Sequence, residues 1–290
     1  MRQRPLHCIT HPLPKMTTLP PSDLAALQTA VTLLETPSLT SKLSNLIGQP
    51  LESALNKLPA GTHAKIGELV QTALRKAADA ALWSLDTQAQ GHASNFLHKA
   101  MAATSGAVGG AFGFAALAVE LPITTTLMLR SIADIARSEG FDLNQVQTKT
   151  ACIEVFAFGG PSGKDDATES AYYAGRAFMA EAVQVAGKAL ADAAAQSGKL
   201  GLSGVTAGQT GTWMAKFIEY VASRFGIVIT EKVAAQAVPL LGAITGATIN
   251  TMFMDFYQDT AKGHFIVKRL EAQYGQDLVR TAYSDLMLRR

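Results

Sequence analysis

Charged residues are scarce in this chain. Asp, Glu, Lys and Arg make up 17% of its 290 residues, whereas soluble globular proteins average about 25%. The formal net charge is only +2, which excludes the strong positive field by which most nucleic-acid-binding proteins attract their ligand. We therefore expect no nucleic-acid partner.

Cysteine is scarcer still, since the chain contains only Cys8 and Cys152. Two cysteines this far apart in sequence form neither a disulfide framework nor a cysteine-based zinc site. Cys152 lies in an apolar helical pattern, where a free thiol behaves as a small hydrophobic group. We expect a reducing, cytoplasmic compartment for the chain.

Signatures of catalysis and of cofactor binding are also missing. Residues 159–165 contain Gly163-Lys164, but a phosphate-binding loop would need Gly in place of Phe158 and Ser or Thr in place of Asp165. The chain has no Gly-x-Ser-x-Gly nucleophile elbow, no His-Glu-x-x-His motif and no Cys-x-x-Cys pair. We therefore expect no metal and no cofactor.

The N-terminal segment has no apolar stretch of the kind that a secretory signal requires. It contains five prolines up to residue 21, a composition typical of disorder. We predict a disordered leader over residues 1–21, and Met16 is an alternative start for the protein.

Apolar residues at helical spacing dominate the rest of the chain, and no segment shows a convincing strand period. The fold predicted over residues 22–290 is all-α, a single bundle-like domain of many helices. Five glycines between Gly198 and Gly211 predict an internal loop. The expected helices cover 22–35, 40–58 with a bend or break at Gly48 and Pro50, 62–85, 122–139, 142–158, 169–197, 213–225 and 265–288.

Two long uncharged runs, 100–119 and 233–254, lie within two predicted Gly/Ala-rich apolar helical hairpins, the first over residues 100–140 and the second over residues 227–262. Glycine inside a helix costs about 1 kcal/mol relative to alanine, and close packing of two helix backbones is the usual compensation. Pro122 suits the first position of a helix, so that we expect two helices to meet at Glu120. The glycines predicted to pack closely are Gly106, Gly109, Gly110, Gly113, Gly242 and Gly246.

Each uncharged run is long enough to span a bilayer. Glu120 and Pro122 beside the first run, Asn250 inside the second, and the abundance of Gly, Ala and Thr weigh against permanent insertion. A buried core and a peripheral contact with lipid both stay open.

Polar residues inside apolar helices need partners, because an unpaired buried charge costs several kcal/mol. Arg130 and Asp134 are four residues apart and can pair on one helix. These residues predict either an ion-pair network that sets the register of the helices or a polar site in a cleft. The candidates are Glu120, Arg130, Asp134, Glu154 and Asn250.

Several short motifs together resemble the signature of the EcsC family over roughly residues 65–288. Four short motifs follow one another: an acidic-x-Pro step, Leu-Arg, Ile-Ala and a Gly-aromatic-Asp turn. Two positions depart from the family pattern, because Glu replaces the usual Asp of the first motif and Ser138-Glu139 replaces the usual aromatic residue before the turn. The resemblance implies a fold more than a function, and a membrane transporter as a possible partner, because the namesake is encoded beside one. The matching segments are 120–122, 129–130, 135–136, 140–142, 154–159 and 238–250.

Our leading prediction is a non-catalytic protein that contacts lipid, a membrane surface or a membrane protein, at the inner face of the cytoplasmic membrane. The alternative is a hydrolase that uses Glu120 or Glu154 together with Arg130 in a cleft. A third possibility is a cytosolic adaptor for a transporter. The sequence predicts no oligomeric state.

Overall fold

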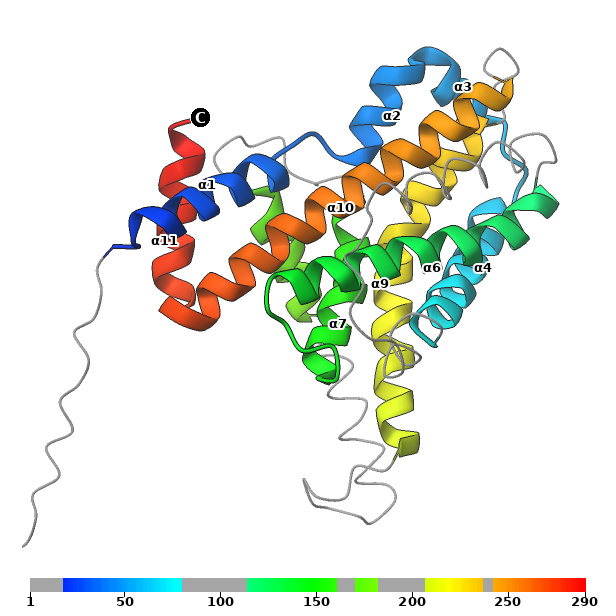
Figure 1. Cartoon of the computed structure of the whole chain (residues 1–290). Helices are drawn as coiled ribbons and strands as arrows, with labels where there is room; N and C mark the ends of the chain where they lie inside the picture. The colour runs from blue at the N-terminus through cyan, green and yellow to red at the C-terminus, as the bar shows by residue number, and fades with distance from the viewer. Residues whose placement is uncertain (1–17, 80–113, 161–169, 182–206, 237–241) are drawn as a thin grey trace, which may run out of the picture.

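The structure is a computed structural model, and it describes residues 18–79, 114–160, 170–181, 207–236 and 242–290 (Figure 1). Every regular element in these ranges is helical, so that the predicted all-α class is confirmed. Residues 171–181 form a helical segment that follows η3. The other elements are α1 (Pro21–Leu34), α2 (Leu39–Ile47), α3 (Gln49–Asn56), α4 (Thr62–Ala78), α6 (Phe114–Ser138), α7 (Val146–Glu154), the 3-10 helix η3 (Val155–Gly159), α9 (Ala207–Gln236), α10 (Gly242–Tyr274) and α11 (Gln276–Leu288).

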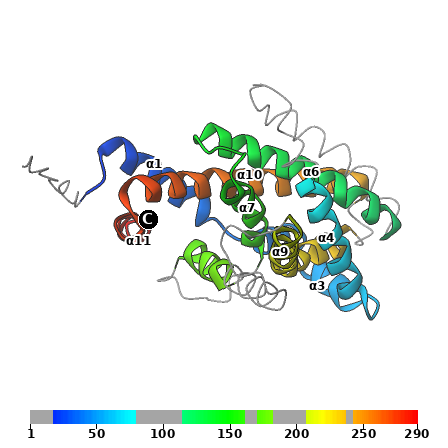
Figure 2. The ribbon, with the colours of Figure 1, turned by 90° about the horizontal axis from the view of Figure 1, so that it is seen from below.

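The longest helix, α10, extends across the molecule and organises the others (Figure 1). The helices α1 and α11 pack against its C-terminal half, whereas α2 lies near its N-terminal half. The helix α4 packs against both α6 and α9, and α6 also packs against α10. The view from below shows α4, α6 and α9 beside α10 (Figure 2).

Two hydrophobic cores follow from this arrangement. The larger core joins α2, α3, α4, α6, α7, η3, segment 171–181, α9 and the part of α10 up to Phe265. The smaller core joins α1, α11 and the end of α10, and it contains Leu27, Leu270 and Tyr283. Leu19 is also buried there, and α1 begins at Pro21, so that the predicted leader is wrong for residues 18–21. Pro21 occupies the first helical turn, where its missing N–H costs little.

The predicted break at Glu120 is wrong, because α6 is continuous and contains Pro122. An internal proline costs about 3 kcal/mol, so the surrounding packing has to offset it. Leu117 and Leu121 are both buried on the same side of α6, and Thr126 Oγ1 donates to the Pro122 carbonyl at 2.7 Å.

Gly275 divides the helix that we predicted over 265–288. Its φ of +86° lies in the left-handed region, which interrupts the helix at low cost only for glycine. The predicted break between α2 and α3 occurs at Gly48. The helix α2 begins at Leu39, before the predicted start at residue 40, because Ser38 caps it, with its Oγ accepting from Ser41 N at 3.2 Å.

Two other predicted boundaries also shift. The helix expected from Asp142 begins at Val146, because Asp142 Oδ1 accepts from Asn144 N in a turn at 2.9 Å. The helix α9 begins at Ala207, inside the loop that we predicted over 198–211. The rest of that loop lies outside the described residues.

Part of the predicted close packing also lies outside the described residues. This applies to the first apolar run up to residue 113, with Gly106, Gly109, Gly110 and Gly113. Gly242 and Gly246 lie in the first turns of α10, where the backbone alone is described. No helix in the described ranges is both long and apolar enough to cross a membrane.

The packing of η3 against α10 leads to the first prediction. A Cβ on Gly159 would collide with the Tyr257 hydroxyl and lie 3.2 Å from Tyr257 Cζ. Tyr257 is fully buried among aromatic rings, including those of Phe156 and Phe225, and has no room to move. We expect Gly159→Ala to lower the free energy of unfolding by about 1–3 kcal/mol in urea titrations, because overpacking strains a core.

The matched control is Gly67→Ala in α4. A Cβ on Gly67 meets no atom within 4 Å, so that alanine should stabilise the helix by about 0.5–1 kcal/mol. Equal effects of the two substitutions would contradict the packing described for Gly159.

Candidate functional site

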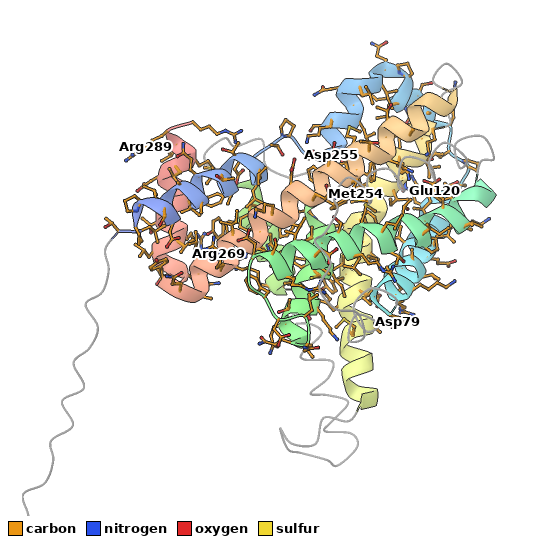
Figure 3. The ribbon with its side chains drawn as sticks, viewed as in Figure 1. Asp79, Glu120, Met254, Asp255, Arg269 and Arg289 are labelled. Atoms are coloured by element: carbon orange, nitrogen blue, oxygen red, sulfur yellow. The ribbon has the colours of Figure 1, made fainter. Side chains whose placement is uncertain are left out.

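Glu120 is the centre of a buried polar group that joins three helices. Its side chain projects from α6 and is only 5% exposed. Lys232 Nζ of α9 donates to Glu120 Oε1 at 2.7 Å, and Asn250 Nδ2 of α10 donates to the same oxygen at 3.1 Å. Figure 3 shows Glu120 near the N-terminal half of α10, far from Arg269 at the other end of that helix.

The surroundings of this group are nearly dry. Burial lowers the pKa of Lys232, and the charge and hydrogen bond of Glu120 act in the opposite direction. The cavity beside Lys232 and Asn250 has a volume of about 10 Å³, which holds at most one water molecule. Among the described residues this cavity leaves no room for a substrate, and the arrangement acts as a joint between α6, α9 and α10.

Arg130 and Asp134 do not belong to this group. Arg130 is exposed, and Asp134 accepts from Arg137 Nη1 at 3.2 Å on the outer side of α6. At 3.6 residues per turn, Arg130 lies almost in line with Val119 on the helix surface rather than with Glu120. The spacing of the two residues in the sequence therefore places Arg130 on a different side of α6 from Glu120.

Glu154 lies in a second polar group at the end of α7. Its Oε2 is 3.7 Å from His264 Nε2 of α10. The other ring nitrogen of His264, Nδ1, is hydrogen-bonded to the Tyr172 hydroxyl at 3.0 Å. His264 is fully buried, and Glu154, His264 and Tyr172 therefore form a chain of titratable side chains through the smaller core.

The pKa values of Glu154 and His264 shift in the directions expected from burial. Burial, helped by the charges of Lys268 and Arg176, moves the pKa of His264 well below its usual value. Burial raises the pKa of Glu154, although the same two cations partly oppose the shift. His264 is therefore neutral at pH 7, and its Nε2 has no hydrogen-bond partner among the described residues.

The structure thus separates the residues that the sequence grouped. Glu120 and Asn250 meet, Glu154 lies elsewhere, and Arg130 and Asp134 lie on the outer side of α6. The sequence analysis missed Lys232, His264 and Tyr172. Lys232 had a detectable signal, because it directly precedes the second uncharged run, whereas a histidine and a tyrosine in long helices give no signal of their own.

Comparison with known proteins gives one match. The model of the EcsC protein family matches residues 15–270, which cover most of the chain and both polar groups. No curated protein and no solved structure gives a match.

The buried ion pair leads to the second prediction. Lys232→Met leaves Glu120 buried without its cation, which should lower the free energy of unfolding by about 3–5 kcal/mol. The double substitution Glu120→Met and Lys232→Met removes both charges and should recover more than half of that loss. Urea unfolding followed by circular dichroism measures both effects.

The control for the ion pair is Lys216→Met, because Lys216 forms an exposed pair with Glu219 at 2.9 Å. An exposed pair contributes about 0–1 kcal/mol. A Lys232→Met variant as stable as Lys216→Met would contradict the role given to Lys232.

The third prediction concerns His264 and pH. Because its pKa is lowered on folding, the unfolded chain binds a proton below pH 6.5 that the folded chain does not. This group should therefore lower the stability of the protein by about 1 kcal/mol between pH 7.5 and pH 5.5. His264→Gln keeps an acceptor for Tyr172 and should remove that loss.

The measurement is the difference in unfolding free energy between the wild type and His264→Gln at the two pH values. Glu154 titrates in both proteins, so that its opposite contribution largely cancels in the difference. His63→Gln, which removes a histidine from an exposed position of α4, is the control substitution. A constant difference between the wild type and His264→Gln would refute the prediction.

Proposed function

The chain belongs to the EcsC protein family, and we propose that it is a non-catalytic helical protein that docks reversibly on a membrane surface. The docking surface is the outer face of the first half of α6. The observation that carries this proposal is the direction of Glu120, the only charged residue between Phe114 and Leu129. Its carboxylate is buried against Lys232, which leaves the outer face of this half of α6 without charge.

Large apolar side chains occupy that outer face. Val119 is 67% exposed and Ile123, one turn later, is 50% exposed. Pro122 lies between them and is half-buried. Exposed aliphatic residues one turn apart on an uncharged face are typical of helices that lie in a membrane interface.

Arg130 marks the polar end of the same face. It follows Val119 by eleven residues, about three helical turns, and it is exposed. A membrane interface accommodates this order, because the aliphatic side chains reach the acyl boundary while the guanidinium stays among the headgroups. Anionic lipids would add an electrostatic attraction.

The expected docking is weak. Burying one Val or Ile side chain contributes about 1.5–3 kcal/mol, and a single acyl chain already gives only marginal, reversible membrane binding. We place the protein at the inner face of the cytoplasmic membrane, where a transporter would offer an apolar surface of the same kind.

A hydrolase that combines Glu120 or Glu154 with Arg130 receives no support from the geometry. Glu120 has its partners in a nearly dry core, Glu154 lies beside His264, and Arg130 is on the surface. The three side chains do not converge on one cleft.

Flotation of the purified full chain with vesicles tests the proposal, and it is the fourth prediction. With vesicles of phosphatidylcholine and phosphatidylglycerol at 3:1, we expect binding that the double substitution Val119→Glu and Ile123→Glu weakens at least about ten-fold. The double substitution Val146→Glu and Ile227→Glu changes the same residue types at exposed positions on α7 and α9 and should leave binding unchanged.

Three outcomes would count against the proposal. The first is that the wild type does not float with the vesicles. The second is that both double variants bind like the wild type, and the third is that both double variants lose binding equally. A different partner would be shown if the wild type does not bind protein-free vesicles but sediments with native membranes. If the Val119→Glu and Ile123→Glu variant no longer sediments with those membranes, the partner is a membrane protein instead.

A further inference from the structure

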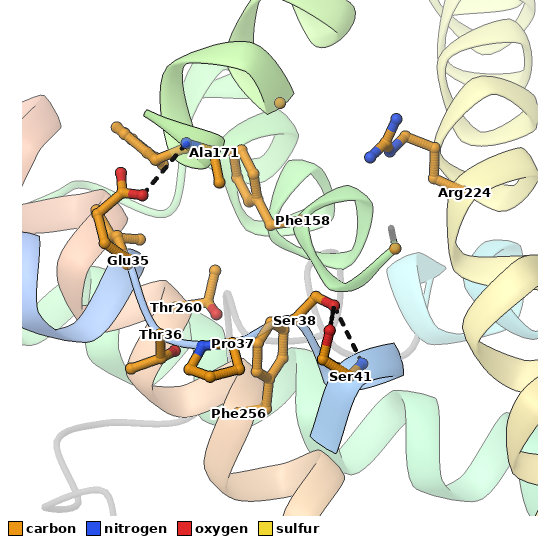
Figure 4. Close-up of a pocket in the computed structure, with 14 residues that line it drawn as sticks. Glu35, Thr36, Pro37, Ser38, Ser41, Phe158, Ala171, Arg224, Phe256 and Thr260 are labelled. Carbon is orange, nitrogen blue, oxygen red and sulfur yellow. Dashed lines mark hydrogen bonds between the residues drawn. The ribbon is translucent and has the colours of Figure 1, made fainter. Parts of the chain in front are cut away.

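A cleft of about 370 Å³ lies where the connection from α1 to α2 passes η3 and α10 (Figure 4). None of its described lining residues belongs to α6, so that it is separate from the proposed membrane face. Its volume falls in the lower part of the range for small-molecule sites, about 300–1,000 Å³. The side chains discussed below are Glu35, Ser38, Ser41, Phe158, Arg224 and Phe256.

Two aromatic rings form apolar walls of the cleft. Phe158 faces it from η3 and Phe256 from α10 (Figure 4). Gly175 lets Phe158 lie close to the following helical segment, because a Cβ on Gly175 would be only 2.8 Å from Phe158 Cδ1. Aromatic walls of this kind favour a ligand with a flat apolar body.

The charged groups of the cleft lie at opposite ends (Figure 4). Glu35 is the one carboxylate among the described lining residues, and donors of this chain already stabilise its charge. Its Oε1 accepts from Tyr283 Oη at 2.8 Å and from Ser170 Oγ at 2.5 Å, and its Oε2 accepts from Ala171 N at 3.2 Å. Glu35 therefore joins α1 and α11 to the segment 171–181.

Arg224 lies at the other end of the cleft (Figure 4). Arg224 is oriented by its Nε, which donates to the Ala157 carbonyl at 3.0 Å, and by the Phe178 ring, whose centroid is 4.9 Å from the guanidinium carbon. A fixed guanidinium is well suited to a planar anionic group.

Hydroxyl groups complete this end of the cleft. Ser38 and Ser41 line it from the start of α2, and their Oγ atoms are 3.0 Å apart. Hydroxyls both donate and accept, so that they can hydrogen-bond an anion that Arg224 attracts. We infer that the cleft binds a small organic anion with a flat apolar body. Its carboxylate, sulfonate or phosphate group lies toward Arg224 and Ser41, and its body lies against Phe158 and Phe256.

Three probes that share a naphthalene body and differ in charge test this inference, which is the fifth prediction. They are naphthalene-1-sulfonate, 1-naphthalenemethanol and 1-naphthylmethylammonium, and calorimetric titration of the full chain measures each dissociation constant. We expect the sulfonate to bind at least about ten-fold more tightly than the alcohol, as one charge-assisted hydrogen bond allows, and the ammonium to bind most weakly. Equal affinities, or tightest binding of the ammonium, would overturn the inference.

Two substitutions locate the binding site. Arg224→Gln should reduce the sulfonate affinity about ten-fold and leave the alcohol affinity unchanged. Arg137→Gln removes an arginine from the surface of α6 and is the control. Ser41→Glu places a carboxylate at the same end of the cleft and should also weaken the sulfonate.

The Ser41→Glu variant is expected to fold, because Ser38 followed three residues later by Glu forms a capping box at the start of α2. Its matched control is Thr281→Glu, which adds the same charge to an exposed position of α11. A sulfonate affinity that survives Ser41→Glu would overturn the inference. So would a loss of sulfonate binding in the Val119→Glu and Ile123→Glu protein, because the probe would then occupy the α6 face.

Discussion

The buried pair of Glu120 and Lys232 is the interaction on which most of the structure depends. It joins α6 to α9 across 112 residues of sequence, and Asn250 adds α10 to the same oxygen. Removing two charges from water costs several kcal/mol per ion, and only good geometry between the partners repays it. The pair therefore favours one relative placement of the three helices.

The same pair also determines the chemistry of the surface. Because Glu120 turns inward, the first half of α6 presents Val119 and Ile123 to the outside without a neighbouring charge. The proposed membrane face and the buried joint are thus two sides of one helix. A rotation of α6 that exposed Glu120 would place a charge on the face and remove the partner of Lys232.

At the other end of α10, polar side chains also act as links between helices. Glu35 connects α1 with Tyr283 of α11 and with the start of segment 171–181. Glu139 at the end of α6 accepts from Lys262 and from Arg269 Nε of α10. The bonds of Glu35 hold α1, α11 and segment 171–181 together, and the bonds of Glu139 hold the end of α6 against α10.

Local signals in the sequence predicted which helices are present better than they predicted where each helix begins and ends. Gly275 and Pro122 are both helix breakers, yet only Gly275 interrupts a helix. The residues around Pro122 are buried on one side of α6, and their packing offsets the lost hydrogen bond. Whether such packing exists depends on helices far away in the sequence, so that the sequence near Pro122 could not show it.

The sequence by itself determined the all-α class, the apolar sides of the helices and the need of Glu120 for a buried partner. These properties follow from residue spacing along one helix and from the cost of burying a charge. Only the tertiary structure decided that the partner of Glu120 is Lys232, that Glu154 meets His264, and that a cleft opens beside Phe158. The period of a helix fixes where a side chain points around its own axis, but not which helix lies opposite.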